Sequence, residues 1–228
     1  MISRHESEMA VIQLHKTTEE PRKSRLSLRE RNKVKKYLAM LNATRDLLLS
    51  EGYDKTTIEA IAELAEVGVA TVYKYFGTKN GLVMEMARVE MAEVLEEVNM
   101  VVADPPADLV DAVIAVLAPV NDMQLTKAGA SLVRLLLDEA WNPQGEVWRD
   151  FSRWVVTELK ARIGDLLADF QLQGELRKSV DTKAAAHIIY SLADYNFICF
   201  ARGEILSVEE MTELTNKQVR MLFGKWTT

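Results

Sequence analysis

Apolar residues recur at helical spacing along most of this chain, and the first such stretch follows a helix-start signal. Ser27 and Glu30 have the spacing of a capping box, so we expect a helix to begin near Leu28. Gly52 is a suitable stop for it. Four apolar residues between these limits fit one face of a 3.6-residue period: Val34, Leu38, Leu41 and Leu48.

Two shorter helices are predicted next. Thr56 and Glu59 form a second capping-box match. A turn over 66–68 then leads into a brief helix over 69–75. Short helices joined by a turn of this length form a helix-turn-helix unit, whose second helix lies in the major groove when the unit reads DNA. The residues expected on the buried face of its first helix are Ile58, Ile61, Ala62 and Ala65.

Long helices are predicted for the rest of the chain. Pro119, Pro143, Gly174 and Gly203 are expected to interrupt or end them. No alternating runs of strand length compete, so we predict an all-α fold of about nine helices. The expected bounds after the helix-turn-helix unit are 79–102, 109–118, 124–141, 146–172, 182–202 and 207–223.

The last helix carries the third start signal of this kind. Ser207 and Glu210 match a capping box, and Leu206 with Met211 has the spacing of a hydrophobic staple. Gly224 is expected to end this helix.

Charge divides the chain into a basic and an acidic part. Residues 21–80 hold 12 Lys and Arg against 7 Asp and Glu, whereas residues 81–228 hold 14 against 23. The net charge of -6 therefore hides a basic N-terminal region on an acidic body. A solvated surface is the alternative explanation of any such charge block.

Composition excludes several classes of protein. Cys199 is the only cysteine, which rules out an intrachain disulfide and a two-cysteine zinc site. The sequence has no membrane-length apolar run, no secretory signal, no Gly-rich phosphate loop and no nucleophile elbow. We therefore expect a cytoplasmic protein that is not an enzyme, with no cofactor, no metal and no membrane partner.

The stretch 37–84 resembles the DNA-binding domain of the tetracycline-repressor (TetR/AcrR) family, without a gap. The matching words are Glu51-Gly52-Tyr53, Thr56-Thr57-Ile58, Ile61-Ala62, the run from Gly68 to Phe76, Thr78-Lys79 and Leu82. A weaker likeness covers the region around Gly174 and Ala185. The resemblance implies a basic, partly disordered extension over 1–33, a three-helix DNA-binding domain over 34–80, and a helical ligand-binding and dimerisation domain over 81–228.

Glu66 departs from the family pattern, which usually has glycine in this turn. An ordinary residue in a left-handed conformation costs about 1 kcal/mol. The carboxylate is also mildly repulsive toward DNA.

Eight residues are predicted to contact DNA. Hydroxyls and a positive charge suit phosphate contacts, for which the family likeness supports Tyr73 and Lys79 most strongly. Val69 and Ala70 stand where family members often touch bases, and here they offer only apolar contact. Base hydrogen bonds then fall to Lys74, Tyr75 or the basic arm over 22–36. The full set is Thr57, Val69, Ala70, Thr71, Tyr73, Lys74, Tyr75 and Lys79, while Val72 and Phe76 are expected in the core.

The basic arm has two interpretations. Residues 22–36 carry eight Lys and Arg against one acid, which suits a minor groove or backbone phosphates. A tail that only solubilises the chain has the same composition.

An effector site, if present, is expected inside the acidic domain. Its aromatic and apolar residues recur at helical spacing, which is typical of a core, and some would line a cavity for a partly apolar small molecule. The candidate lining residues are Met86, Met123, Trp141, Phe151 and Tyr195, with His187 and Asn196 as polar groups.

The leading hypothesis from these features is a ligand-responsive TetR-type regulator, a repressor that binds a palindromic operator in double-stranded DNA. The family likeness implies a homodimer through the last two helices, over 182–202 and 207–223. The alternative is a helical sensor or protein-interaction module whose DNA-binding domain has degenerated.

Overall fold

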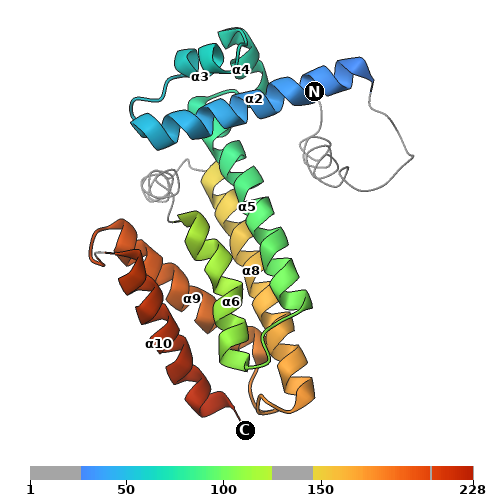
Figure 1. Cartoon of the computed structure of the whole chain (residues 1–228), viewed down its shortest axis with the longest axis vertical. Helices are drawn as coiled ribbons and strands as arrows, with labels where there is room; N and C mark the ends of the chain where they lie inside the picture. Colours follow the sequence, from blue (N-terminus) through green and yellow to red (C-terminus); the bar gives the residue numbers. More distant parts are fainter. Residues whose placement is uncertain (1–26, 125–145, 206, 228) are drawn as a thin grey trace.

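The computed structural model describes residues 27–124, 146–205 and 207–227, which form eight helices (Figure 1). Within these ranges the only strand-like pairing is one isolated bridge between Leu176 and Thr227. The all-α prediction is confirmed. The helices are α2 (Leu28–Glu51), α3 (Ile58–Leu64), α4 (Val69–Phe76), α5 (Lys79–Ala103), α6 (Leu109–Gln124), α8 (Glu146–Gln173), α9 (Thr182–Ala201) and α10 (Val208–Trp226).

Some predicted features lie outside the described residues. These are the helix expected over 124–141, apart from its first residue, and the staple residue Leu206. The arm over 22–36 is described only from residue 27 onward. Its residues 28–33, expected to belong to the extension, form the first turns of α2.

The head of the molecule consists of α2, α3 and α4, packed around a shared core. The buried face predicted for α3 is confirmed, since Ile58, Ile61, Ala62 and Ala65 are all buried. The stripe predicted for α2 is turned: Leu41 and Leu48 are buried, but Val34 and Leu38 are only half-buried. The buried face of α2 is Tyr37, Met40, Leu41, Ala43, Thr44 and Leu48.

One residue of this buried face of α2 is polar, so the apolar pattern of the sequence did not indicate the whole face. Thr44 is fully buried, and its hydroxyl donates to the Met40 carbonyl at 2.7 Å. That bond satisfies the hydroxyl, so its burial carries little penalty.

The starts of the helices follow their capping residues, with one correction. Ser27 and Glu30 form the predicted capping box. The cap of α3 is Thr57, one residue later than predicted, and its side-chain oxygen accepts from the Ala60 amide. Thr56 is buried instead, and its hydroxyl donates to the Gly52 carbonyl at 2.8 Å.

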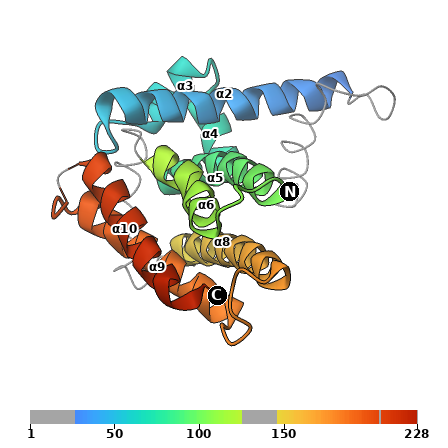
Figure 2. The ribbon, with the colours of Figure 1, turned by 60° about the horizontal axis from the view of Figure 1, so that its bottom comes forward.

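The body consists of α5, α6, α8, α9 and α10. Helix α5 leaves the head and runs into the body, where it packs against α6 and α8 (Figures 1 and 2). Helix α9 packs on α8, and α10 lies against both α9 and α6. Because α5 contacts α2 and α4 at one end and α8 further on, it is the helix that joins the two parts.

Two helices continue past residues that were expected to end them. Helix α6 runs through Pro119 to Gln124, because Val116, Leu117 and Val120 on both sides of the proline are buried in the body core. This packing offsets the lost backbone bond. Helix α10 continues through Gly224 to Trp226, whose ring meets that of Phe223 edge-on at 5.4 Å.

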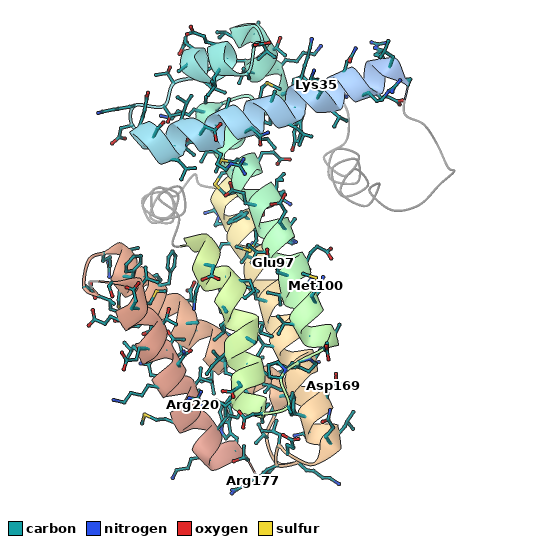
Figure 3. The ribbon with its side chains drawn as sticks, in the orientation of Figure 1. Lys35, Glu97, Met100, Asp169, Arg177 and Arg220 are labelled. Atoms are coloured by element: carbon teal, nitrogen blue, oxygen red, sulfur yellow. The ribbon has the colours of Figure 1, made fainter. Side chains whose placement is uncertain are left out.

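Polar side chains also tie the body helices together. Arg220 of α10 donates to Asp111 of α6 at 2.9 Å, and both side chains are more than half exposed (Figure 3). Such an exposed pair adds little stability. Arg162 of α8 is more enclosed and donates to Asn99 of α5 at 2.7 Å.

Candidate DNA-binding interface

The turn between α3 and α4 closes around one left-handed residue. Glu66 has φ of 53°, the only positive φ of a non-glycine residue in the described ranges. The next residue, Val67, donates its amide to the Ala62 carbonyl at 2.9 Å, and α4 begins after Gly68. Glu66 thus adopts the left-handed conformation to which a glycine is suited, and the two helices are joined as a helix-turn-helix unit.

Helix α4 is held by one face and presents the other. Val72 is completely buried, which confirms its place in the core. On the outer side Val69 is 36% exposed and Tyr73 is 49% exposed, and Ala70 and Lys74 are exposed as well. The outer face of α4 therefore presents an aromatic ring, an amine and two small apolar groups to the outside.

Hydroxyl groups flank this outer face. Thr71 is half-buried on α4, while Thr57 is exposed at the start of α3. The Thr57 oxygen accepts from the Ala60 amide at 3.1 Å. A hydroxyl that accepts one bond still has its own proton to donate, so Thr57 suits a phosphate oxygen.

Lys79 is less free than its sequence position suggested. Its ammonium donates to the Tyr53 carbonyl at 2.5 Å and lies 3.9 Å from the centre of the Tyr53 ring. Burial lowers the pKa of Lys79, an effect that the nearby Asp54 opposes. Lys79 thus ties the start of α5 to the loop before α3, and a DNA contact would be a second role.

Tyr75 is a predicted contact that lies partly in the interior of the head. Its ring is half-buried, at 6.5 Å from that of Tyr37 and 6.0 Å from that of Phe76. Burial raises the pKa of the Tyr75 hydroxyl. The assignment of base contacts to Tyr75 stays a prediction, and only part of its side chain faces outward.

A glycine outside the predicted set of contacts fixes the junction between α4 and α5. A Cβ atom at Gly81 would lie 2.4 Å from the Phe76 carbonyl oxygen and 3.3 Å from the Thr78 hydroxyl. The first of these neighbours is backbone, so it cannot turn aside. Only glycine lets the end of α4 come this close to the start of α5, and its position three residues after Thr78 is the available sequence signal.

The described residues proposed to line an effector site differ in their burial. Met86 and Phe151 are buried in the body core, whereas His187 is exposed and Tyr195 is 63% exposed. Asn196 is buried and already bonded. Trp141 and the side chain of Met123 lie outside the described residues.

Asn196 instead joins the last two helices. Its amide donates to the Thr215 hydroxyl at 2.9 Å and to Gln218 Oε1 at 2.7 Å. Both helices also carry exposed apolar side chains, Ile188 and Tyr195 on α9 and Met221 on α10. The described parts of α9 and α10 are therefore joined by hydrogen bonds, and each exposes apolar side chains.

His187 and its neighbours on α9 form a polar cluster with α8. His187 Nδ1 lies 2.6 Å from Lys160 Nζ, and the Tyr190 hydroxyl donates to Asp194 at 3.3 Å. Burial raises the pKa of Asp194, an effect that the bond from Tyr190 and the charge of Lys160 oppose. Each group is engaged within the body, and the arrangement offers no nucleophile with an activating base.

Metal sites and membrane spans are both missing from the described ranges. These ranges contain no group of three or more His, Cys, Asp and Glu side chains suited to a metal ion. None of the helices described is both long and apolar enough to cross a membrane.

Known proteins resemble this chain in the sequence of the head and in the fold. Residues 40–86 match the model of the bacterial regulatory proteins of the tetR family. Over 47 residues the chain is 45% identical to YdeS of Bacillus subtilis (strain 168), an uncharacterized HTH-type transcriptional regulator. That stretch is 21% of this chain and 24% of the relative, so the likeness spans about a quarter of YdeS.

Solved structures extend the likeness to the body. The fatty acid degradation regulator FadR from Bacillus halodurans has a TM-score of 0.65 at 18% identity, over 83% of this chain and 95% of its own. FadR from Thermus thermophilus, a TetR-family repressor in complex with lauroyl-CoA, has a TM-score of 0.60 at 19% identity, over 82% and 92%. At these identities the likeness concerns the fold. The match to the tetR family of bacterial regulatory proteins covers residues 40–86, which lie in the head and the start of α5.

Proposed function

We propose that this protein is a ligand-responsive transcriptional repressor that binds a palindromic operator as a homodimer. The observation that carries the proposal is the arrangement of α4. Its buried Val72 holds the helix on the head, while Tyr73 and Lys74 face outward within the stretch that matches the family. A helix presented in this way suits the major groove.

The exposed chemistry of α4 points to a division of labour on DNA. Val69 and Ala70 suit apolar contact with thymine methyl groups. Tyr73, Thr71 and Thr57 suit phosphate oxygens, which fix the register of the helix on the duplex. Lys74 is the exposed group on α4 best able to donate to a base edge or a phosphate.

The first turns of α2 extend this surface. Arg29, Arg31 and Lys35 are exposed, and Lys35 lies at the same end of the molecule as α3 and α4 (Figure 3). We assign these charges to phosphates that flank the operator. They would contribute affinity that falls with salt and little sequence preference.

The dimer is assigned to the exposed apolar side chains of α9 and α10. Ile188, Tyr195 and Met221 are 43%, 63% and 70% exposed, so these helices have apolar surface that a second copy could cover. The bonds of Asn196 to α10 make the two helices one unit that can pair with its copy. A two-fold dimer presents two copies of α4, which is why the operator should be palindromic.

The effector is assigned to the body, as a small molecule with an apolar part. FadR from Thermus thermophilus, whose fold this chain shares, is in complex with lauroyl-CoA. Fatty acyl thioesters therefore head the panel of compounds to test. An effector that binds one arrangement of α5 more tightly than the other would shift the spacing of the two α4 helices.

The test of DNA binding begins with a selection, so the operator sequence is one of its results. Genomic fragments are selected on the purified full-length protein, and the enriched site is titrated by fluorescence anisotropy at several salt concentrations. We expect a palindromic site and an affinity that falls steeply with salt. Binding without sequence preference would refute the repressor and favour the rival, a sensor or interaction module with a degenerate head.

The dimer and the effector are tested separately. Ile188→Asp is expected to give monomers in analytical ultracentrifugation and to lower operator affinity, whereas Leu172→Asp, at an exposed apolar position on α8, should leave the dimer intact. Acyl-CoA esters of increasing chain length are then added to the operator complex, with coenzyme A alone as control. Release that depends on chain length supports an acyl effector, and equal behaviour of all esters excludes it.

A further inference from the structure

A set of aromatic and polar contacts leads from the body to α4, the recognition helix of the proposed function. It reaches α4 through Tyr37 of α2. The Tyr37 ring lies 5.6 Å from that of Phe76, at an angle of 29°, and 6.5 Å from that of Tyr75. Both partners stand in the last turn of α4. Aromatic pairs at these distances stabilise one another beyond simple burial, so a shift of Tyr37 acts on the end of α4.

Glu85 of α5 holds the other end of Tyr37. The Tyr37 hydroxyl donates to Glu85 Oε1 at 2.5 Å, and Glu85 Oε2 lies 4.0 Å from Arg88 Nε. The side chains of Glu85 and Arg88 are each only 17% exposed. Away from water such contacts are stronger, and a lost partner is costlier. One carboxylate thus spans the crossing of α2 and α5.

Arg88 continues the set into the body. Its guanidinium carbon lies 5.3 Å from the centre of the Trp154 ring on α8. That ring in turn lies 6.0 Å from the ring of Phe151, which is buried in the body core. Helix α8 has no contact with DNA in the proposed function. Trp154 is a residue of the body, and its link to the head runs through the side chains of Arg88, Glu85 and Tyr37.

We propose that Glu85 and Arg88 are positioning residues for the recognition helix. A change in how α8 packs against α5 is transmitted by these two residues, through Tyr37, to the C-terminal end of α4. A relative displacement of about 1 Å is enough to stretch the bond between Tyr37 and Glu85 out of range, so the link responds to small movements. The inference rests on the proposed function, because it assigns a mechanism to the regulation of that DNA-binding helix.

A second arginine between the same two helices provides the matched control. Arg162 of α8 donates to Asn99 of α5 at 2.7 Å, and its side chain is 19% exposed, close to the value for Arg88. Its contact with α5 is further from the head than Arg88 is, and it has no described contact with Tyr37 or Glu85. Arg162→Met and Arg88→Met therefore remove similar groups, of which only Arg88 belongs to the link.

The experiment measures hydrogen exchange of the amides of residues 71–76 in the full-length protein, together with operator affinity. Tyr37→Phe keeps the ring and removes the hydroxyl, and Arg88→Met removes the charge. Each is expected to speed exchange in α4 about threefold or more, and the double variant no further than the larger single effect, because coupled contacts are not additive. Arg162→Met should leave exchange in α4 within twofold of the wild type.

Several results would overturn the proposal. Unchanged exchange in α4 on Arg88→Met would do so, as would additive effects of the two substitutions. An equal effect of Arg162→Met would mean general loosening of the body. Should Arg88→Met unfold the protein, Glu85→Gln, which keeps the shape of the side chain, takes its place. If the wild type binds no operator, the proposed function fails, and the exchange measurement still decides whether the link exists.

Discussion

The head and the body of this protein use helices of different length for different ends. In the head, α3 and α4 have 7 and 8 residues, too short to be stable alone, so caps, a turn and a few buried side chains hold them. In the body, α5 and α8 have 25 and 28 residues and are stabilised by packing along their length. The head therefore presents its candidate binding side chains to the outside, whereas the body packs its side chains between long helices. Sites on the head follow from local signals, and sites in the body depend on how distant helices meet.

The largest expected effect is at the junction where α4 meets α5. Gly81→Ala places a methyl group 2.4 Å from the Phe76 carbonyl oxygen, so the backbone must shift, at a cost of about 1–3 kcal/mol. We expect a lower melting temperature and weaker operator binding. Thermal unfolding and anisotropy measure the two effects.

Gly164 of α8 provides the counterpart in the body. A Cβ atom there would lie 3.8 Å from that of Ala186, an ordinary contact, so Gly164→Ala should stabilise the helix by about 0.5–1 kcal/mol. Opposite signs at the two glycines would support the close approach at the head. Destabilisation by both substitutions to the same extent would contradict it.

The next effect concerns the outer face of α4. Tyr73→Phe removes one hydroxyl and should weaken operator binding by about 0.5–1.5 kcal/mol, or roughly two- to tenfold, while Tyr73→Ala should cost more. Because the tyrosine carries no charge, the dependence of affinity on salt should stay the same. Anisotropy titrations at several salt concentrations test both points.

Met100→Ala is the control for Tyr73. Met100 is 66% exposed on α5, well away from the head (Figure 3). It should leave operator binding unchanged. Normal binding by Tyr73→Ala would mean that the docking face of α4 is assigned wrongly.

A smaller effect is expected in the turn of the head. Glu66→Gly removes the strain of a left-handed residue with φ of 53° and should stabilise the protein by up to about 1 kcal/mol. Glu63→Gly, three residues earlier within α3, should destabilise it by about the same amount. Thermal unfolding of the two variants should therefore move in opposite directions. A loss of stability in both would show that the Glu66 side chain supports the turn.

Most of the head could be predicted from the sequence, because its signals are local. The turn at Glu66, the cap at Ser27 and the buried position of Val72 all follow from spacing within a few residues. The cap of α3 was one residue off, since Thr56 and Thr57 are equally good acceptors. Only the tertiary structure shows that the first of them is buried.

The body could be predicted as helices but not as a site. Long-range contacts such as Tyr37 with Glu85, or Arg88 with Trp154, leave no mark in residue spacing. Tyr195 was expected to line a cavity because it is aromatic, yet it is mostly exposed. A helical pattern gives which residues share a face, and not which neighbour that face meets.

The smallest predicted effect lies where the head meets the body. Burial raises the pKa of the Glu90 carboxyl on α5, which Arg45 of α2 opposes and Glu93 reinforces. A carboxyl whose pKa is higher in the folded state than in the unfolded state contributes less stability as the pH rises through that folded value. Glu90→Gln stays neutral at every pH, so the variant should be more stable than the wild type at pH values above the folded-state pKa of Glu90. The difference, about 0.5 kcal/mol or less, should vanish in acid.

Melting temperatures at pH 4 to 8 distinguish burial from the attraction of Arg45. Glu97→Gln, at an exposed position on the same helix (Figure 3), is the control for the loss of one carboxylate from α5. A lower melting temperature of Glu90→Gln at pH 8 would show that the pair of Arg45 and Glu90 outweighs the cost of burial. The charge of Glu90 would then help to hold α5 against α2. It would be a second contact between these helices, beside the one between Glu85 and Tyr37.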